Sequence, residues 1–299
     1  MSLDNPSGLD SPAAAPSRTT PSPTTPSGGE PTVVVGVDGS VANLAALAWA
    51  THEAQVSGRT LQRVSVGSEE SLRSGDPSSQ VTVGEPSRAL VRAATGQAML
   101  VVGKRGVGSL RRAVLGSTSI AVAGRSSVTV VVVPHEWTAA TAANGPIVVG
   151  IDGTERDSRV LEFAFKRARS LQVPLEVVCS WQVPPLYAWS VEDVGRWEAS
   201  GTTQLAGALR PLMARFPDVV VHPSSPTVDP AEALLATAGS TAQLVVLGRH
   251  SGPRHPGGLA LGGTARRVLH HSRCPVAIVV AEAGGADADG FEESHVPEL

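Results

Sequence analysis

Aromatic residues are scarce in this chain of 299 residues, at 3% against 41% hydrophobic residues overall. A core must therefore be built mainly from Val, Ala and Leu, which suits a parallel sheet covered by helices on both faces. Long apolar runs are lacking as well, since no stretch approaches the roughly eighteen residues of a membrane span. The N-terminus has no basic segment followed by an apolar one, so no secretory signal is predicted. We therefore expect a cytoplasmic protein that does not engage a membrane.

Cysteine and an excess of either charge are also lacking. Cys179 and Cys274 lie far apart in apolar runs without metal-binding or redox spacing, which predicts reduced thiols inside the core. The chain has 24 basic and 27 acidic residues, so its net charge of −3 predicts no general binding of nucleic acid. The histidines between residues 250 and 271 lack the spacing of zinc ligands. No metal site made of protein side chains is predicted.

Composition divides the chain into segments. Residues 1–31 are dominated by Ser, Thr, Pro and Gly, which predicts a disordered tail. Residues 282–299 carry acidic residues but no Lys or Arg, and we interpret them as a second solvated tail. An Ala- and Thr-rich linker at 135–145 separates two predicted domains, 32–134 and 146–281.

The two predicted domains repeat one another. The run VVVGVDGS at 33–40 matches IVVGIDGT at 147–154 with an offset of 114 residues. Further along, Glu85-Pro86 matches Asp229-Pro230 with an offset of 144, so the first repeat lacks 30 residues between its second and third strands. That is the length of a crossover helix with its loops. The second repeat has such a helix at about 195–215, and the first domain should be a trimmed version of the second.

Each repeat alternates short β-branched strands, such as Leu100–Val102 and Leu244–Leu247, with helices. This alternation predicts an α/β fold of two tandem doubly wound parallel-sheet domains. For each domain we adopt the strand order 3-2-1-4-5, one of the orders known for such sheets. Ligands bind such sheets at the carboxyl ends of the strands, where the strand order reverses. A ligand site is therefore expected between the first and fourth strands of each repeat.

The loop after the fourth strand of repeat one is rich in glycine. It begins at 103–106 with Gly-Lys-Arg-Gly, and nine residues later Gly116-Ser117-Thr118 precedes a predicted helix. Glycines let backbone amides approach an anion, and a helix N-terminus offers free N–H groups and the positive end of a dipole. Ser117 and Thr118 can cap that helix or donate hydroxyl hydrogen bonds. Basic residues add positive charge to the loop: Lys104, Arg105, Arg111 and Arg112.

The first strand ends in Asp38, which should face this loop. Taken alone, Asp38-Gly39-Ser40 is more typical of a turn that caps the first helix. Together with the loop, Asp38 favours a ligand role, as an acceptor for ribose or adenine or as a partner of a phosphate-bound metal. The loop and Asp38 together predict a polyphosphate site.

The pattern G-x2-G-x9-G-[S/T], combined with V-G-x-D-G-S after the first strand, resembles the ATP-binding branch of the universal stress proteins, which have a HUP-like α/β fold. The resemblance implies that ATP binds with Mg²⁺ or Mn²⁺ on its phosphates. It places adenosine beside Gly36, Asp38 and the backbone near Val66. It also implies that the last strands, 128–133 and 276–280, pair with each other. Ribose and phosphates would border Gly103, Gly106, Gly116, Ser117 and Thr118.

Repeat two departs from this pattern. The stretch 248–252, Gly-Arg-His-Ser-Gly, has one residue more between its glycines, and Gly263 stands where repeat one has Ser117. Weaker or absent nucleotide binding is therefore expected in repeat two, and which repeat binds stays open. Its candidate residues are Asp152, Gly248, Gly252, Gly262, Gly263 and Thr264.

No residue set is typical of rapid catalysis, since a Walker lysine-serine pair and a recognisable Ser/His/Asp set are lacking. We interpret the chain as a stress-response binding module that ATP regulates, with at most slow hydrolysis. A protein partner, or a second copy of the chain, would read its nucleotide state. An ATP enzyme is disfavoured because the first strand does not lead into a Ser-Gly-Gly-x-Asp loop. The alternative is a degenerate tandem scaffold that binds no nucleotide and mediates protein interactions.

Overall fold

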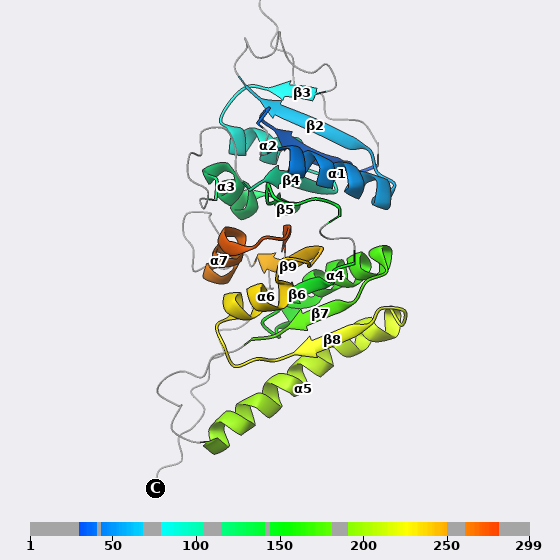
Figure 1. Ribbon diagram of the computed structural model, residues 1–299, viewed down its shortest axis with the longest axis vertical. Helices are drawn as coiled ribbons and strands as arrows, with labels where there is room; N and C mark the ends of the chain where they lie inside the picture. The colour runs from blue at the N-terminus through cyan, green and yellow to red at the C-terminus, as the bar shows by residue number, and fades with distance from the viewer. Residues whose placement is uncertain are drawn as a thin grey trace, which may run out of the picture. The chain divides into compact units, whose positions relative to one another are not determined.

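The computed structural model describes residues 30–40, 43–67, 79–104, 115–140, 144–180, 191–249 and 261–280. All elements below belong to the compact unit Pro31–Leu299 (Figure 1). The N-terminal half contains β1 (Val33–Val37), α1 (Leu44–Ser57), β2 (Leu61–Val66), β3 (Ser79–Thr82), α2 (Pro86–Ala94), β4 (Met99–Gly103), α3 (Ser117–Arg125) and β5 (Thr129–Val133).

The C-terminal half follows the same order and adds one long helix. It contains β6 (Ile147–Gly150), the 3-10 helix η2 (Glu155–Asp157), α4 (Ser158–Leu171), β7 (Leu175–Val178), α5 (Val191–Arg215), β8 (Val221–Ser224), α6 (Pro230–Ala238), β9 (Leu244–Arg249), α7 (Gly263–His271) and β10 (Val276–Val280). The extra helix is α5. It covers the predicted crossover helix of repeat two and begins four residues earlier than predicted.

The strands form one sheet in the order β3-β2-β1-β4-β5-β10-β9-β6-β7-β8. Each half therefore has the predicted 3-2-1-4-5 order, with parallel pairs throughout. The halves meet where β5 and β10 pair antiparallel, with Val132 opposite Val276. The predicted fold and the pairing of the last strands are confirmed. This pairing joins two edges that would otherwise stay exposed.

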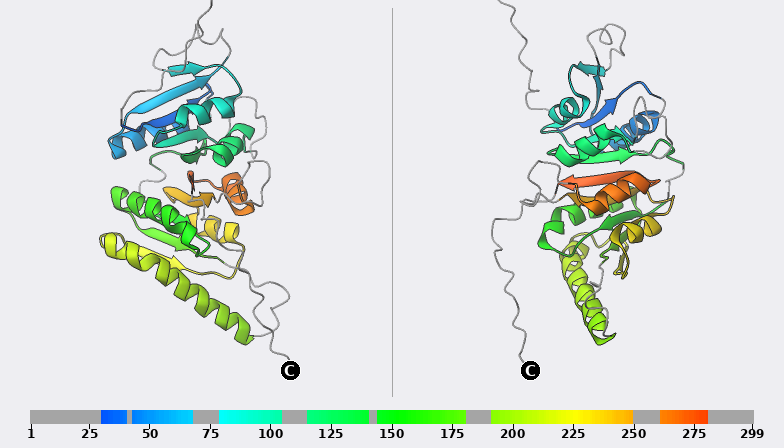
Figure 2. Two further views of the ribbon diagram at one scale, coloured as in Figure 1. Left: turned by 180° about the vertical axis from the view of Figure 1, so that it is seen from behind. Right: turned by 90° about the vertical axis from the view of Figure 1, so that its left-hand side faces the viewer.

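Two apolar cores cover the two faces of the sheet, because successive strand residues point to opposite sides. Val33 and Val35 belong to the core that also contains residues of α1, α4 and α5. Val34 belongs to the core that contains residues of α2, α3, α6 and α7. Figure 2 shows these helices on either side of the strands. Cys179 and Cys274 are buried free thiols, as predicted.

The strand order positions the candidate sites. In each half the central strand, β1 or β6, has its two sequence neighbours on opposite sides, so the carboxyl ends of β1 and β4, and of β6 and β9, border a crevice. The helices that follow β4 and β9, namely α3 and α7, begin near these crevices. Among the described residues, no helix is long and apolar enough to cross a membrane.

Candidate functional site

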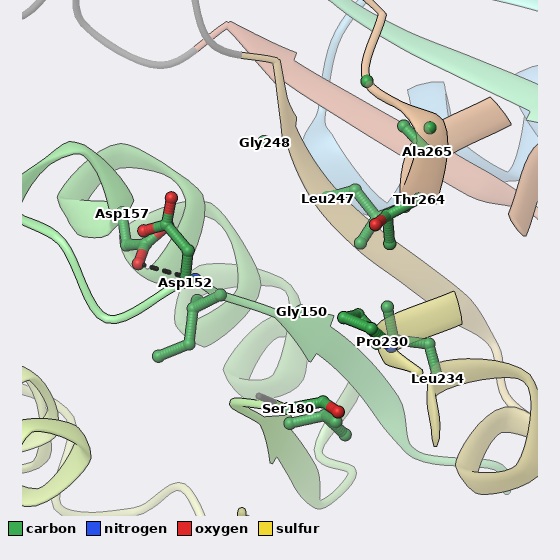
Figure 3. Close-up of a pocket in the computed structure, with 14 residues that line it drawn as sticks. Gly150, Asp152, Asp157, Ser180, Pro230, Leu234, Leu247, Gly248, Thr264 and Ala265 are labelled. Atoms are coloured by element: carbon green, nitrogen blue, oxygen red, sulfur yellow. Dashed lines mark hydrogen bonds between the residues drawn. The ribbon is translucent and has the colours of Figure 1, made fainter. Parts of the chain in front are cut away.

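A cavity of about 350 Å³ opens at the carboxyl ends of β6 and β9, where the strand order of the second half reverses. Its walls come from the ends of β6, β7 and β9, the loop after β6, and the first turns of α6 and α7 (Figure 3). The lining residues are Gly150, Ile151, Asp152, Asp157, Val178, Ser180, Pro230, Leu234, Leu247, Gly248, Gly262, Gly263, Thr264 and Ala265.

Five residues predicted from repeat two line this cavity together: Asp152, Gly248, Gly262, Gly263 and Thr264. The sixth, Gly252, lies outside the described residues. In repeat one the predicted residues occupy the equivalent positions in the fold. Gly36 lies in β1, Val66 ends β2 and Gly103 ends β4. Gly116 is the N-cap of α3, and Ser117 and Thr118 are its first residues. Gly106 lies outside the described residues.

The first turn of α7 forms the polar end of the cavity. Gly262 is the N-cap, in extended conformation, and as a glycine it has no side chain with which to cap the helix. The first N–H groups of a helix have no partner within the helix, so they can bind an anion. At Gly262 and Gly263 an added Cβ atom would meet no atom of the described residues within 4 Å, so these residues leave space in front of the helix start. The first turn of α3 is similar, with Gly116 as its N-cap. Ser117 and Thr118 therefore do not cap that helix.

Asp38 and Asp152 form the same turn in the two halves. Asp38 Oδ1 accepts hydrogen bonds from the backbone N–H of Ser40 at 3.0 Å and from its hydroxyl at 2.7 Å. Asp152 Oδ1 accepts from the N–H of Thr154 at 2.9 Å and from its hydroxyl at 2.6 Å. Asp38-Gly39-Ser40 thus forms the turn that its sequence predicts. This turn does not cap the first helix, because the N-cap residue of α1 is Asn43.

Lys104 departs from its predicted role as a positive charge for phosphate. Its side chain is buried, and Nζ donates a hydrogen bond of 2.8 Å to the carbonyl of Ser272, the C-cap residue of α7. Arg249, the equivalent residue and the last one of β9, donates to the carbonyls of Gly124 and Ser126 at the end of α3. The physical reason is that the last carbonyls of a helix lack partners and attract cations.

Asp157 is a cavity residue that the sequence analysis missed. It is only 2% exposed, and its Oδ2 accepts hydrogen bonds from the N–H groups of Asp152, Gly153 and Thr154 at 2.8–3.1 Å. Figure 3 shows its carboxylate beside that of Asp152. The pKa of Asp157 is raised to about 7, mainly because the carboxyl group is buried and secondly because Asp152 places a negative charge beside it. The offset of 114 pairs it with Asn43, whose Nδ2 donates to the carbonyl of Gly36 at 3.0 Å. The sequence signal for Asp157 is that repeat two has an acid at the position where repeat one has the amide Asn43.

The Asp157→Asn variant is expected to lose a pH dependence of stability that the wild type has. The folded pKa lies above the unfolded value of 3.8, so the contribution of Asp157 is complete below about pH 4 and is lost as pH rises through about 7. Urea unfolding at pH 5 and pH 8 should show a smaller fall in the free energy of unfolding for the variant. An equal fall in both proteins would contradict the raised pKa.

Within the described part of the chain, no group of three or more His, Cys, Asp or Glu could hold a metal ion. The cavity offers two neighbouring carboxylates, Asp152 and Asp157. Magnesium is commonly bound through one or two carboxylates together with substrate phosphates. The residues present thus fit a magnesium ion carried by phosphates better than a dedicated protein site.

Comparison with known proteins gives consistent matches. The model of the universal stress protein family matches residues 66–134 and 144–280. A universal stress protein of Mycobacterium tuberculosis (strain H37Rv) is 32% identical over 221 residues, covering 72% of this chain and 69% of that protein.

Two solved structures from Archaeoglobus fulgidus also match. A universal stress protein covers 84% of this chain and 96% of its own, with 17% identity and a TM-score of 0.59, which indicates a shared fold. Another, solved in complex with dAMP, matches 46% of this chain and 98% of its own, with 25% identity and a TM-score of 0.34.

Proposed function

The chain belongs to the universal stress protein family, and from that premise we propose that it binds ATP in the cavity between β6 and β9 and acts as a nucleotide-regulated binding module. The observation that carries this proposal is the arrangement of the cavity itself. A glycine-lined helix start, an acidic turn and an apolar crevice meet at one strand-order reversal. The volume of about 350 Å³ falls within the range of small-molecule sites.

The cavity divides into parts that suit the parts of a nucleotide. Ile151, Val178, Leu234 and Leu247 give an apolar wall on which an adenine ring can pack. Asp152 can accept hydrogen bonds from ribose hydroxyls, since each carboxylate oxygen has two acceptor positions. The uncapped first turn of α7 can bind the phosphates through its N–H groups, with magnesium carried on them.

The equivalent positions of repeat one make it a second candidate site. The end of β1 and the start of α3 occupy the same places in repeat one as the end of β6 and the start of α7 in repeat two. Asn43 replaces Asp157 there, so the turn after β1 carries one carboxylate where the second half has two. A site with less negative charge repels phosphates less, and we propose that repeat one also binds nucleotide.

A binding module transmits the presence of its ligand through a surface that changes. A partner that binds the nucleotide-bound form better than the free form shifts the population toward it. A protein partner or a second copy of this chain could provide that readout. No group in the described cavity is assigned a catalytic role, and hydrolysis of ATP is at most slow in this proposal.

Titration of the full-length chain with ATP and magnesium tests the proposal. We expect saturable binding by calorimetry, and thermal unfolding that shifts upward with ligand, because ATP at about 100 times its Kd adds about 2.7 kcal/mol to the stability of the folded state. GTP serves as the control for the adenine contacts. Absence of heat at millimolar ATP, with no shift in unfolding, would overturn the proposal and favour a scaffold that binds no nucleotide.

A further inference from the structure

A second cavity, of about 230 Å³, lies between the two halves, away from the nucleotide site. Trp49 and His52 of α1 and Trp137, in the segment after β5, contribute from the N-terminal side. Arg167 of α4 contributes from the other half, as does Gln243, which directly precedes β9. Gln243 marks the amino end of that strand, whereas the nucleotide cavity lies at its carboxyl end. The two cavities therefore lie at opposite ends of the strands.

Two indole rings line this second cavity. The chain has five Trp residues, and two of them, Trp49 and Trp137, line it while being 5% and 8% exposed. In an aromatic-poor protein this concentration is notable, because aromatic walls favour flat, ring-containing ligands. A cavity of about 150 Å³ is enough to hold benzene. The observed volume therefore admits a compound of one or two rings.

Two buried donors in the cavity lining lack acceptors. The indole N–H of Trp137 and the Nε–H of Arg167 have no hydrogen-bond partner within the described structure. Buried polar groups in folded proteins are nearly always hydrogen-bonded, and an exception calls for an explanation such as a bound molecule. Both residues line this cavity. A ligand that carries acceptor oxygens would satisfy both donors.

Arg167 is the charged residue among those that line the cavity, and its guanidinium is a donor for an anionic acceptor. The Glu53 carboxylate binds the two terminal nitrogens of the Arg167 guanidinium, at 2.9 and 2.5 Å. The Nε–H of Arg167 is therefore left to donate to a ligand. The exposed imidazole of His52 adds a third potential donor. We propose that this cavity binds a small aromatic carboxylate, whose ring packs between the indoles and whose oxygens accept from Trp137 and Arg167. Proximity of Glu53 limits the ligand to a single negative charge.

Calorimetric titration of the full-length chain with benzoate tests this proposal. We expect benzoate to bind, and to bind at least about tenfold more tightly than cyclohexanecarboxylate, which lacks the planar ring, and benzamide, which lacks the charge. Trp137→Phe keeps a ring but removes the N–H, and should weaken benzoate binding at least fivefold. Trp49→Phe is the matched control, because the indole N–H of Trp49 is not among the buried donors without a partner, and should change it less than twofold.

Two further variants keep the test independent of folding and of nucleotide binding. Ala139 lines the cavity and is exposed, so Ala139→Trp should close the mouth and abolish benzoate binding without unfolding the protein. Gly263→Leu, in the nucleotide cavity, should leave benzoate binding unchanged. No benzoate binding at millimolar concentration, or equal effects of Trp137→Phe and Trp49→Phe, would overturn the proposal. Loss of benzoate binding in Gly263→Leu would place the benzoate in the nucleotide cavity instead.

Discussion

Replacing Arg167 with methionine is expected to lower the free energy of unfolding by about 3–5 kcal/mol, the cost typical of breaking a buried ion pair from one side. Arg167 of α4 pairs with Glu53 of α1 through Nη1–Oε1 at 2.9 Å and Nη2–Oε2 at 2.5 Å. The two side chains are only 10% and 2% exposed. Burial raises the pKa of Glu53, and the positive charge of Arg167 opposes that rise. Without Arg167 an unpaired carboxyl group would remain in the core.

Urea unfolding of the variants measures this effect. The double variant Arg167→Met, Glu53→Leu should regain much of the lost stability, because it removes the stranded acid as well. The single variant should also recover toward pH 4, since protonation of Glu53 removes its charge. The exposed pair of Arg169 and Asp218, also 2.9 Å apart, provides the control, and Arg169→Met should cost less than about 1 kcal/mol. A buried single variant as stable as this control would contradict the argument.

The same junction contains the reciprocal contacts of Lys104 and Arg249. Each lies at the carboxyl end of the fourth strand of its half and donates to carbonyls at the end of the final helix of the other half. Arg249 directly follows Gly248, a residue of the cavity lining, and it binds the helix whose first turn begins at Ser117. The wall of one candidate site is thus bonded to the helix that forms the other. The two halves thus share both a continuous sheet and reciprocal helix contacts.

Short sequence patterns predict the strands and helix starts that depend on residues close together in the chain. The repeat at 33–40 and 147–154 predicts equivalent first strands, and the glycine-to-helix transition predicts where α3 and α7 begin. The alternation of strands and helices predicts a doubly wound parallel sheet, but it is compatible with more than one strand order. The boundaries of the tails and the linker remain predictions.

Long-range partners were beyond such patterns. Lys104 binds a carbonyl that is 168 residues away in the chain, so its sequence context, a glycine-rich basic loop, indicated a phosphate ligand instead. The role of Asp157 depends on its burial beneath the turn at 152–154, and burial of an acid is invisible to charge counting. The expectation of weaker binding in repeat two rests on loop spacing, whereas five of the six candidates of repeat two line one cavity in the described structure.

Gly263→Leu is expected to weaken ATP binding by the second half about a hundredfold while leaving the free energy of unfolding nearly unchanged. The added side chain starts in space that the described residues leave open, because a Cβ atom at this position meets none of their atoms within 4 Å. It would instead fill the cavity over the first turn of α7 and keep phosphates from the N–H groups. Loss of two charge-assisted hydrogen bonds costs about 3 kcal/mol or more, and each 1.4 kcal/mol is a factor of about ten.

Calorimetry with ATP and magnesium, paired with urea unfolding, measures both quantities. Gly263→Ala should have an intermediate effect, since it adds only the first carbon. Gly207→Leu, on an exposed face of α5 where an added Cβ also meets open space, is the matched control and should bind ATP as the wild type does. Ser117→Leu tests the equivalent position in the first half. If only Ser117→Leu removes binding, ATP occupies the first half alone. If neither variant weakens it, the main-chain N–H groups at these helix starts are not what binds the triphosphate.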